Sequence, residues 1–236
     1  KDDQKVMVQI KGDGPLQELV AVADAAGHVK GYVAEPRVDF PLNQYGKLDV
    51  SRGVGAGQLF VTRHIGLKEP YRGAVPLLSG EIGDDIAYYF AKSEQIPSVV
   101  SLGVLVETDN SVRAAGGLMV QVMPDADEHL IEQVEERADR FSNISRKIDA
   151  GQLPEEILKD VFHDLGIEIL DRMSVEFRCE CSKERFERGL ISLGERGLQE
   201  LLADDTSAEA VCQFCGAKYQ FDQEDLLRIL SEARAD

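Results

Sequence analysis

Cys179-Glu180-Cys181 and Cys212-Gln213-Phe214-Cys215-Gly216 together contain all 4 cysteines of the chain. Zinc prefers a tetrahedron of ligands, and thiolates at about 2.3 Å satisfy it when two come from one short turn and two from another. Gly216 follows the second pair, where a residue without Cβ lets the backbone turn its amides toward the sulfurs. The sequence therefore predicts one four-thiolate zinc site per chain, in a small C-terminal domain.

The residues alone leave two roles open for this site. Structural zinc supplies on the order of 10–16 kcal/mol of apparent binding free energy, so losing it should unfold a small domain. Oxidation removes zinc because a disulfide sulfur is no longer a thiolate. A disulfide between Cys179 and Cys181 would be difficult on a strand, because Cα atoms two residues apart lie roughly 6.6 Å from each other, near the largest Cα separation that a disulfide spans. Arg178, Lys183 and Arg185 would favour thiolates, whereas Glu180 and Glu184 oppose them. A structural staple and a redox switch are both compatible with this pattern.

The charge balance excludes several classes of partner. The 236 residues carry 26 Lys plus Arg against 43 Asp plus Glu, and the formal net charge of −17 has the wrong sign for neutralising phosphates. We therefore expect neither nucleic acid nor an anionic membrane as a partner.

No apolar run approaches the roughly 18 residues of a membrane span, and Lys1–Lys11 alternates charged and apolar residues, unlike a secretory signal. A cytoplasmic protein is predicted, in which clustered cysteines indicate metal or thiol chemistry.

Residues 1–124 have the pattern of an α+β core domain with a mixed or antiparallel sheet. One helix is predicted over Ser79–Ser93, with Ser79 as its cap and Ile82 and Ile86 on its apolar face. Turn-prone stretches separate the strand-like runs around it. The predicted strands are Lys5–Lys11, Leu19–Asp24, Val29–Ala34, Gln58–Ile65, Gly73–Leu78, Val99–Glu107 and Val112–Met123.

Residues 125–170 change to a helical period and are predicted to form a linker of three short amphipathic helices. The last apolar stripe includes Ile157 and Val161 and begins after Pro154. Over residues 125–164 there are 12 acidic residues and 5 basic ones. A segment so charged, with narrow apolar faces, has little core of its own, so it must lean on its neighbours.

Residues 171–236 are predicted to form the zinc-binding domain. The strand-like Val175-Glu176-Phe177 leads into the first cysteine pair, and helices capped by Ser182 and Asp222 follow the first and second pairs. The segment carries 9 basic and 15 acidic side chains, with no basic face. The main alternative is a zinc-ribbon-like module that binds nucleic acid or a protein partner and whose zinc is purely structural. The charge balance argues against nucleic acid as its ligand.

Other motifs are assigned no catalytic role, and the chain is predicted not to be an enzyme. A thiol oxidoreductase would need Cys212-Gln213-Phe214-Cys215 to open a helix near a βαβ pattern, whereas this pair lies between strand-like segments. Ser51–Gly57 lacks the Lys-Ser/Thr ending of a P-loop and is predicted to be a turn before a strand. Asp84 and Asp85 are expected on the exposed side of their helix. The histidines, which lack metal-ligand spacing, are His28, His64, His129 and His163.

The cysteine-containing segments resemble a known bacterial family. They are similar to segments of the redox-regulated heat-shock chaperones of thirty-three kilodaltons, which are holdases. The similar segments are Cys179-Glu180-Cys181-Ser182-Lys183-Glu184-Arg185-Phe186 and, after a spacer, Cys212-Gln213-Phe214-Cys215. The resemblance covers essentially the whole chain. Segments similar to that family's core-domain motifs are Gly31-Tyr32-Val33, Val75-Pro76-Leu77-Leu78-Ser79-Gly80-Glu81-Ile82, Tyr88-Tyr89-Phe90, Ser93-Glu94-Gln95-Ile96-Pro97-Ser98 and Ala115-Gly116-Gly117.

The resemblance implies an ATP-independent chaperone that is inactive when reduced and zinc-bound, and is activated by oxidants such as peroxide or hypochlorite, particularly with mild heat. It implies disulfides between Cys179 and Cys181 and between Cys212 and Cys215, then zinc release, unfolding of the C-terminal domain and exposure of apolar linker surface. Implied partners are unfolding client proteins, a second copy in an oxidised homodimer and ATP-dependent foldases as recipients. Family members usually begin with a further strand and a long helix ahead of Lys5–Ile10, so we expect an N-terminal part to be missing.

Overall fold

A computed structural model of the chain describes residues 4–39, 42, 48–66, 69–141, 143–204 and 207–233. The fold is α+β, as the sequence predicts. The chain divides into two compact units. Unit 1 comprises Lys1–Gly27 and Val33–Val175, and unit 2 comprises His28–Tyr32 and Glu176–Asp236. Among the helices of the described residues, none is long and apolar enough to cross a membrane.

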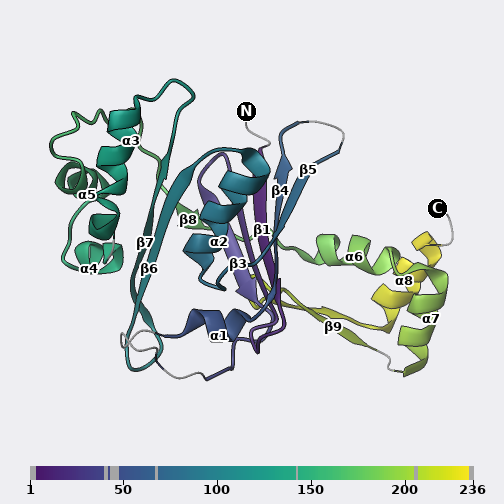
Figure 1. The fold of residues 1–236 in the computed structure, drawn as a ribbon. Helices are drawn as coiled ribbons and strands as arrows, with labels where there is room; N and C mark the ends of the chain where they lie inside the picture. The colour runs from purple at the N-terminus through teal and green to yellow at the C-terminus, as the bar shows by residue number, and fades with distance from the viewer. Residues whose placement is uncertain are drawn as a thin grey trace. The chain divides into compact units, whose positions relative to one another are not determined.

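Unit 1 contains an antiparallel sheet. Its strands, in spatial order, are β5 (Tyr71–Pro76), β4 (Gly57–His64), β1 (Lys5–Gly12) and β2 (Glu18–Asp24). Ile10 of β1 pairs with Leu59 of β4, which pairs with Val75 of β5, so three buried side chains form a row across the sheet. Helix α2 (Ile82–Tyr89) covers this row and adds the buried ring of Tyr89 (Figure 1). The alternation of inward apolar residues that predicted these strands therefore forms the first core.

The helix predicted over Ser79–Ser93 begins later and changes character before its end. Its first turn starts at Ile82 with Glu81 as the N-cap residue, and a π-helical turn, η1 (Phe90–Glu94), continues it. Ser79 is therefore not the cap that the sequence predicted. Its hydroxyl accepts a hydrogen bond from the Glu81 amide at 3.1 Å, within the turn that precedes the helix.

Asp85 is fully buried, which corrects the prediction that it is exposed, whereas Asp84 is exposed as predicted. The Asp85 carboxylate accepts hydrogen bonds from the backbone amides of Leu78, Ser79 and Gly80 at 2.6, 3.1 and 3.1 Å. The strand-to-helix turn folds over this carboxylate, a contact that helical periodicity does not reveal. Three amide donors offset the cost of burying the charge.

A short helix, α1 (Val50–Val54), replaces the turn that the glycine-rich stretch predicted. The side chain of Asp49 accepts a hydrogen bond from the Arg52 amide and caps this helix. Gly55, with a φ of 72°, ends it in a conformation that favours glycine, and β4 begins at Gly57. The predicted strand after the stretch is confirmed, although its approach is helical.

A second antiparallel sheet of unit 1 is the hairpin of β6 (Ser98–Val106) and β7 (Val112–Gln121). Helices of the acidic segment cover one face of this hairpin (Figure 1). These helices are α3 (Glu128–Glu135), the 3-10 turn η2 (Ala138–Phe141), α4 (Ile144–Asp149) and α5 (Pro154–Val161). The predicted change from strands to short helices after residue 124 is thus confirmed, whereas the predicted domain boundaries stay a prediction.

The acidic segment and the hairpin share one apolar cluster, so the segment leans on its neighbour, as its charge and narrow apolar faces predict. The buried residues of this cluster are Phe141, Ile157, Val161 and Phe162, and they pack with Val99, Leu118 and Val120 of the hairpin and with further residues of the segment, among them Val134 and Leu165. Polar contacts add to this packing, because the Ser101 hydroxyl donates to the Phe141 carbonyl at 2.7 Å. Arg113 of β7 also donates from Nε to Asp149 of α4 at 2.6 Å.

Unit 2 consists of short elements that lie before, between and after the two cysteine pairs. Ser182 accepts a hydrogen bond from the Arg185 amide at 3.3 Å, and Asp222 accepts one from the Asp225 amide at 2.9 Å, so both predicted helix caps are confirmed. The strands β3 (His28–Val33) and β8 (Glu176–Phe177) pair in the parallel direction. The remaining elements are α6 (Lys183–Ile191), α7 (Gly194–Asp204), the antiparallel hairpin of β9 (Ala208–Val211) and β10 (Lys218–Phe221), and α8 (Gln223–Ala233).

Replacing Asp85 with Ala should lower the free energy of unfolding of unit 1 by about 3 kcal/mol, because three buried amides lose their acceptor at about 1 kcal/mol or more each. Asp84→Ala is the matched control, since it removes the same charge from an exposed neighbour. Urea unfolding followed by circular dichroism measures both variants. Equal stabilities would contradict the structural role of Asp85.

Candidate metal centre

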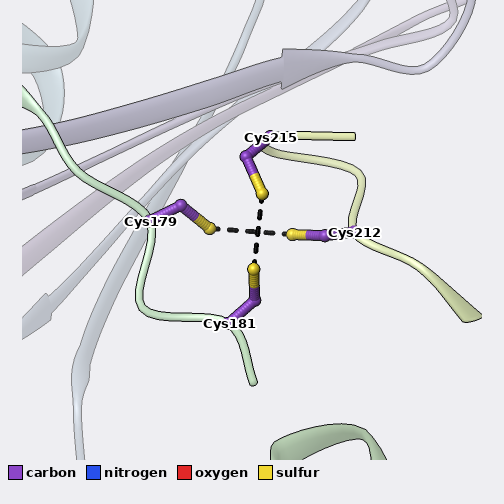
Figure 2. A group of neighbouring side chains, drawn as sticks. All are labelled: Cys179, Cys181, Cys212 and Cys215. Carbon is purple, nitrogen blue, oxygen red and sulfur yellow. Dashed lines mark hydrogen bonds between the residues drawn. The ribbon is translucent and has the colours of Figure 1, made fainter. Parts of the chain in front are cut away.

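The four cysteine side chains converge on one point in unit 2. Figure 2 shows them pointing inward from two separate loops, and their Sγ atoms all lie within 4.8 Å of one another. The Sγ of Cys179 lies 3.6 Å from that of Cys212, and the Sγ of Cys181 lies 3.3 Å from that of Cys215. The prediction that both pairs join one cluster is confirmed.

The second loop is a tight turn between β9 and β10. The Cys212 amide donates to the Ala217 carbonyl at 2.8 Å, and the Gly216 amide donates to the Cys212 carbonyl at 2.8 Å. Gly216 has a φ of 72°, a left-handed conformation that glycine adopts without the strain of a Cβ. These bonds close the turn so that Cys212 is buried and Cys215 is exposed.

The first loop lies between β8 and α6 and is not part of a strand. The Arg178 amide donates to the Val29 carbonyl at 3.0 Å, which fixes the start of the loop on β3. At its end, Ser182 caps α6, and Arg185 donates from Nη1 to the Glu180 carbonyl at 3.0 Å. β8 ends at Phe177, so the Cys179–Cys181 pair lies just beyond the strand.

Sequence reasoning missed Tyr219, whose hydroxyl contacts the first loop. Its Oη lies 3.0 Å from the carbonyl oxygen of Cys181 and 3.2 Å from its Sγ. The ring packs against Phe186, with 5.1 Å between ring centroids. The alternation of Tyr219 and Phe221 in β10 is the sequence signal that could have indicated an inward face, but only the fold shows which loop the hydroxyl reaches.

Hydrogen bonds within the cluster separate the pKa values of the thiols. The Tyr219 hydroxyl, together with Cys215, lowers the pKa of Cys181 to about 7. The Ala217 amide lowers the pKa of Cys215, but Cys181 and the other cysteines raise it, to about 12. Burial raises the pKa of Cys179. Four thiolates at these distances repel one another, so a bound cation is needed for all four to lose their protons.

A family model described as Hsp33 protein matches residues 1–222 of the chain. The chain belongs to the Hsp33 family. The 33 kDa chaperonin of Levilactobacillus brevis is 48% identical over 236 residues, a match that covers 100% of this chain and 80% of that protein. The 33 kDa chaperonin of Bacillus subtilis is 48% identical over 227 residues, covering 96% of this chain and 78% of that protein.

The fold of this Hsp33 family member is also similar to a solved structure. The crystal structure of the 33 kDa chaperonin from Thermotoga maritima matches it with a TM-score of 0.89 and 35% identity, covering 100% of this chain and 80% of that one. The resemblance drawn from the sequence motifs is therefore confirmed, and the chain is a member of a chaperone family.

The sulfur geometry of the Hsp33 cluster fits a single tetrahedral metal ion. Ligands about 2.3 Å from a central ion define a tetrahedron with edges of about 3.8 Å. The Sγ separations of 3.3 and 3.6 Å, with an upper limit of 4.8 Å, bracket that edge. Four soft thiolates favour zinc or iron–sulfur chemistry over hard cations such as magnesium. The cluster can therefore hold a metal ion, and zinc stays the prediction.

The basic residues near the Hsp33 cysteines are arranged differently from the sequence prediction. Lys183 donates to the Asp225 carboxylate at 2.6 Å, and Arg178 lies 3.9 Å from Glu176, so carboxylates engage both cations. Arg185 remains at the cavity beside the sulfurs, where Lys30 joins it from a distant part of the sequence. The residues that line this cavity are Lys30, Cys179, Cys181, Arg185, Phe186, Cys212 and Phe214.

The disulfide pairs that the resemblance implies stay a prediction. All four cysteines are free, and the Sγ separations of 3.6 and 3.3 Å join cysteines from different loops. In a tetrahedral cluster every sulfur is close to every other, so these distances do not select a pairing. Among the described residues, the four cysteines are the one group of His, Cys, Asp and Glu placed to share a metal ion, and the histidines do not join it.

Replacing Gly216 with Ala should weaken metal binding and lower the stability of unit 2 by about 1–2 kcal/mol, because a left-handed backbone costs a residue with a Cβ about that much. Gly189→Ala is the matched control. An added Cβ meets nothing within 4 Å at either position, but only Gly216 of the two has a positive φ. Chelator competition and urea unfolding measure the two effects. Identical behaviour of the variants would contradict a role for this turn.

Proposed function

We propose that the chain is a redox-regulated, ATP-independent holdase that is inactive when reduced and zinc-bound. The observation that carries the proposal is a cluster of cysteine Sγ atoms within 4.8 Å of one another, in a chain of the Hsp33 family. Bound zinc would supply the positive charge that keeps the thiolates together. The residues proposed to hold it are Cys179, Cys181, Cys212 and Cys215.

Peroxide is proposed to convert neighbouring cysteines into disulfides, Cys179 with Cys181 and Cys212 with Cys215. In each pair one thiolate attacks a peroxide oxygen, the O–O bond breaks, and a sulfenic acid forms while hydroxide leaves. The partner thiolate then attacks the sulfenic sulfur, the S–S bond forms, and the second oxygen leaves as hydroxide. Each pair thus gives two electrons to one peroxide, and both hydroxides take up protons to become water. Neither pair can then hold the ion, because a disulfide sulfur is no thiolate.

Unit 2 is proposed to unfold when its thiolates are lost, because its own core is small. A single core in fewer than about 70–80 residues rarely supplies more than about 3–5 kcal/mol, whereas structural zinc adds on the order of 10–16 kcal/mol. Like-charge repulsion between sulfurs would oppose any metal-free cluster. The buried residues of the unit 2 core are Leu198, Phe221, Leu226, Ile229 and Leu230.

Unfolding of unit 2 is proposed to destabilise the acidic linker, residues 125–170, and to expose apolar surface to clients. The linker joins unit 2 through the chain itself, and it shares its buried cluster with the β6–β7 hairpin. A segment of short, highly charged helices is proposed to have low local stability. Its release would uncover both the linker residues Phe141, Ile157, Val161 and Phe162 and the hairpin residues Val99, Leu118 and Val120.

The proposed partners follow from this binding mode. Apolar surface binds unfolding proteins without a catalytic step, so we propose a chaperone with no enzymatic activity. ATP-dependent foldases are proposed to receive clients after reduction, and the oxidised form is proposed to be a homodimer. A cytoplasmic location would keep the thiols reduced until oxidative stress. The net charge of −17 argues against nucleic acid and anionic membranes as partners.

Peroxide treatment of the reduced, zinc-loaded chain should release about one zinc ion per chain and turn on suppression of client aggregation. The reason is that both cysteine pairs lose their thiolates and the linker surface becomes exposed. Light scattering of a thermally unfolding client measures holdase activity, and a zinc-binding dye measures release in the same sample. Reduction with added zinc should reverse both signals.

The control is the chain in which all four cysteines are Ser. This variant should bind no zinc, and its holdase activity should not change with peroxide. Zinc release without any gain in aggregation suppression would contradict the switch and leave the alternative of a purely structural zinc.

A further inference from the structure

Tyr219 connects the two cysteine loops through one hydroxyl group. The residue lies on β10, which follows the loop of Cys212 and Cys215, but its hydroxyl reaches the other loop. There it lies 3.0 Å from the carbonyl oxygen of Cys181 and 3.2 Å from the Sγ of the same residue. A hydroxyl carries one hydrogen, so the oxygen and the sulfur share a single donor.

The ring of Tyr219 is fixed by its surroundings, so its hydroxyl is directed at Cys181. Its backbone pairs with Ala210 across the β9–β10 hairpin. The ring lies 5.1 Å from that of Phe186 on α6, measured between centroids. Two residues further along β10, Phe221 is fully buried and anchors the strand in the core of unit 2. A rigid aromatic side chain packed against another ring loses little freedom when it donates a hydrogen bond.

We propose that Tyr219 is a positioning residue for the metal centre, which holds the Sγ of Cys181 in the orientation of a ligand. This inference rests on the proposed metal-binding function of the cluster. Groups that hydrogen-bond to metal ligands orient them and tune their donor strength, and removing one typically costs about 10–100-fold in metal affinity. An O–H donor directed at a thiolate also offsets part of the negative charge that four sulfurs concentrate.

Tyr219 donates toward a sulfur, whereas Arg185 and Lys183 donate to other groups. Arg185, which lines the same cavity, donates to the backbone carbonyl of Glu180 rather than to a sulfur. Lys183 is engaged by Asp225. Tyr219 therefore ties a backbone atom and a ligand atom of the first loop to the hairpin that carries the second loop.

The test compares full-length chains with Tyr219→Phe and Ile229→Val. The first variant keeps the ring and removes only the hydroxyl. The second removes one buried methylene from the core of the same unit, at a residue that does not line the cavity beside the sulfurs. Zinc affinity is measured by competition with a chromophoric chelator. Cobalt(II) is then substituted, and its thiolate-to-metal charge-transfer bands report the electron density on the sulfurs.

Tyr219→Phe should lower zinc affinity by about tenfold and move the cobalt bands to longer wavelength, because one sulfur lone pair loses its donor. Ile229→Val also loses some affinity, since metal binding and folding are coupled, but it should leave the bands in place. Bands of Tyr219→Phe that match those of the wild type would overturn the proposal, as would a wild type that binds neither metal.

Failure of the proposed function gives a different result. If the wild-type chain gained no holdase activity on oxidation while the cobalt bands of Tyr219→Phe shifted, the switch would fail and the positioning role would stand. If oxidation activated the wild type but the bands did not shift, the switch would stand without a role for Tyr219.

Discussion

Mutual repulsion of four sulfurs is the constraint on which unit 2 depends. Two unit charges 4 Å apart repel by about 4 kcal/mol at an effective dielectric constant of about 20, and all four Sγ atoms lie within 4.8 Å. The repulsion energy of one such pair is similar in size to the folding free energy of about 3–5 kcal/mol that a core of this size supplies. The fold nevertheless brings the sulfurs together, with the Gly216 turn on one side and the Ser182 cap on the other. That arrangement is stable in the thiolate form only with a cation at its centre.

The division of the chain into two units determines what a loss of that cation affects first. Unit 1 has its own core, in which Ile10, Leu59 and Val75 pack beneath Tyr89, and this core contains none of the cysteines. The acidic helices pack on the β6–β7 hairpin through a separate cluster. On the proposed function, a thiol reaction would therefore unfold unit 2 and leave this core of unit 1 folded. The proposed switch requires such a division, because an active chaperone must keep part of its structure folded.

Features set by local sequence were predictable, and features set by distant contacts were not. The alternation in β1, β4 and β7, the caps Ser182 and Asp222, and the joining of the two cysteine pairs all follow from spacing and propensity. The burial of Asp85 depends on three amides of a turn that precedes its helix, so the helical period alone placed it on the wrong face. The contact between Tyr219 and Cys181 spans 38 positions and depends on how the hairpin folds back.

Hydrogen exchange tests most directly whether the fold of unit 2 depends on a bound metal. It is measured on the reduced chain with zinc bound, and again after a chelator has removed the zinc without any oxidant. Removal of zinc should abolish protection of the amides in α7, α8 and the β9–β10 hairpin, and weaken protection in α3 to α5. The amides of β1 and β4 should stay protected. If α7 and α8 kept their protection without zinc, the metal would not be what holds unit 2 together, and oxidation of the cysteines would have no structural consequence to transmit.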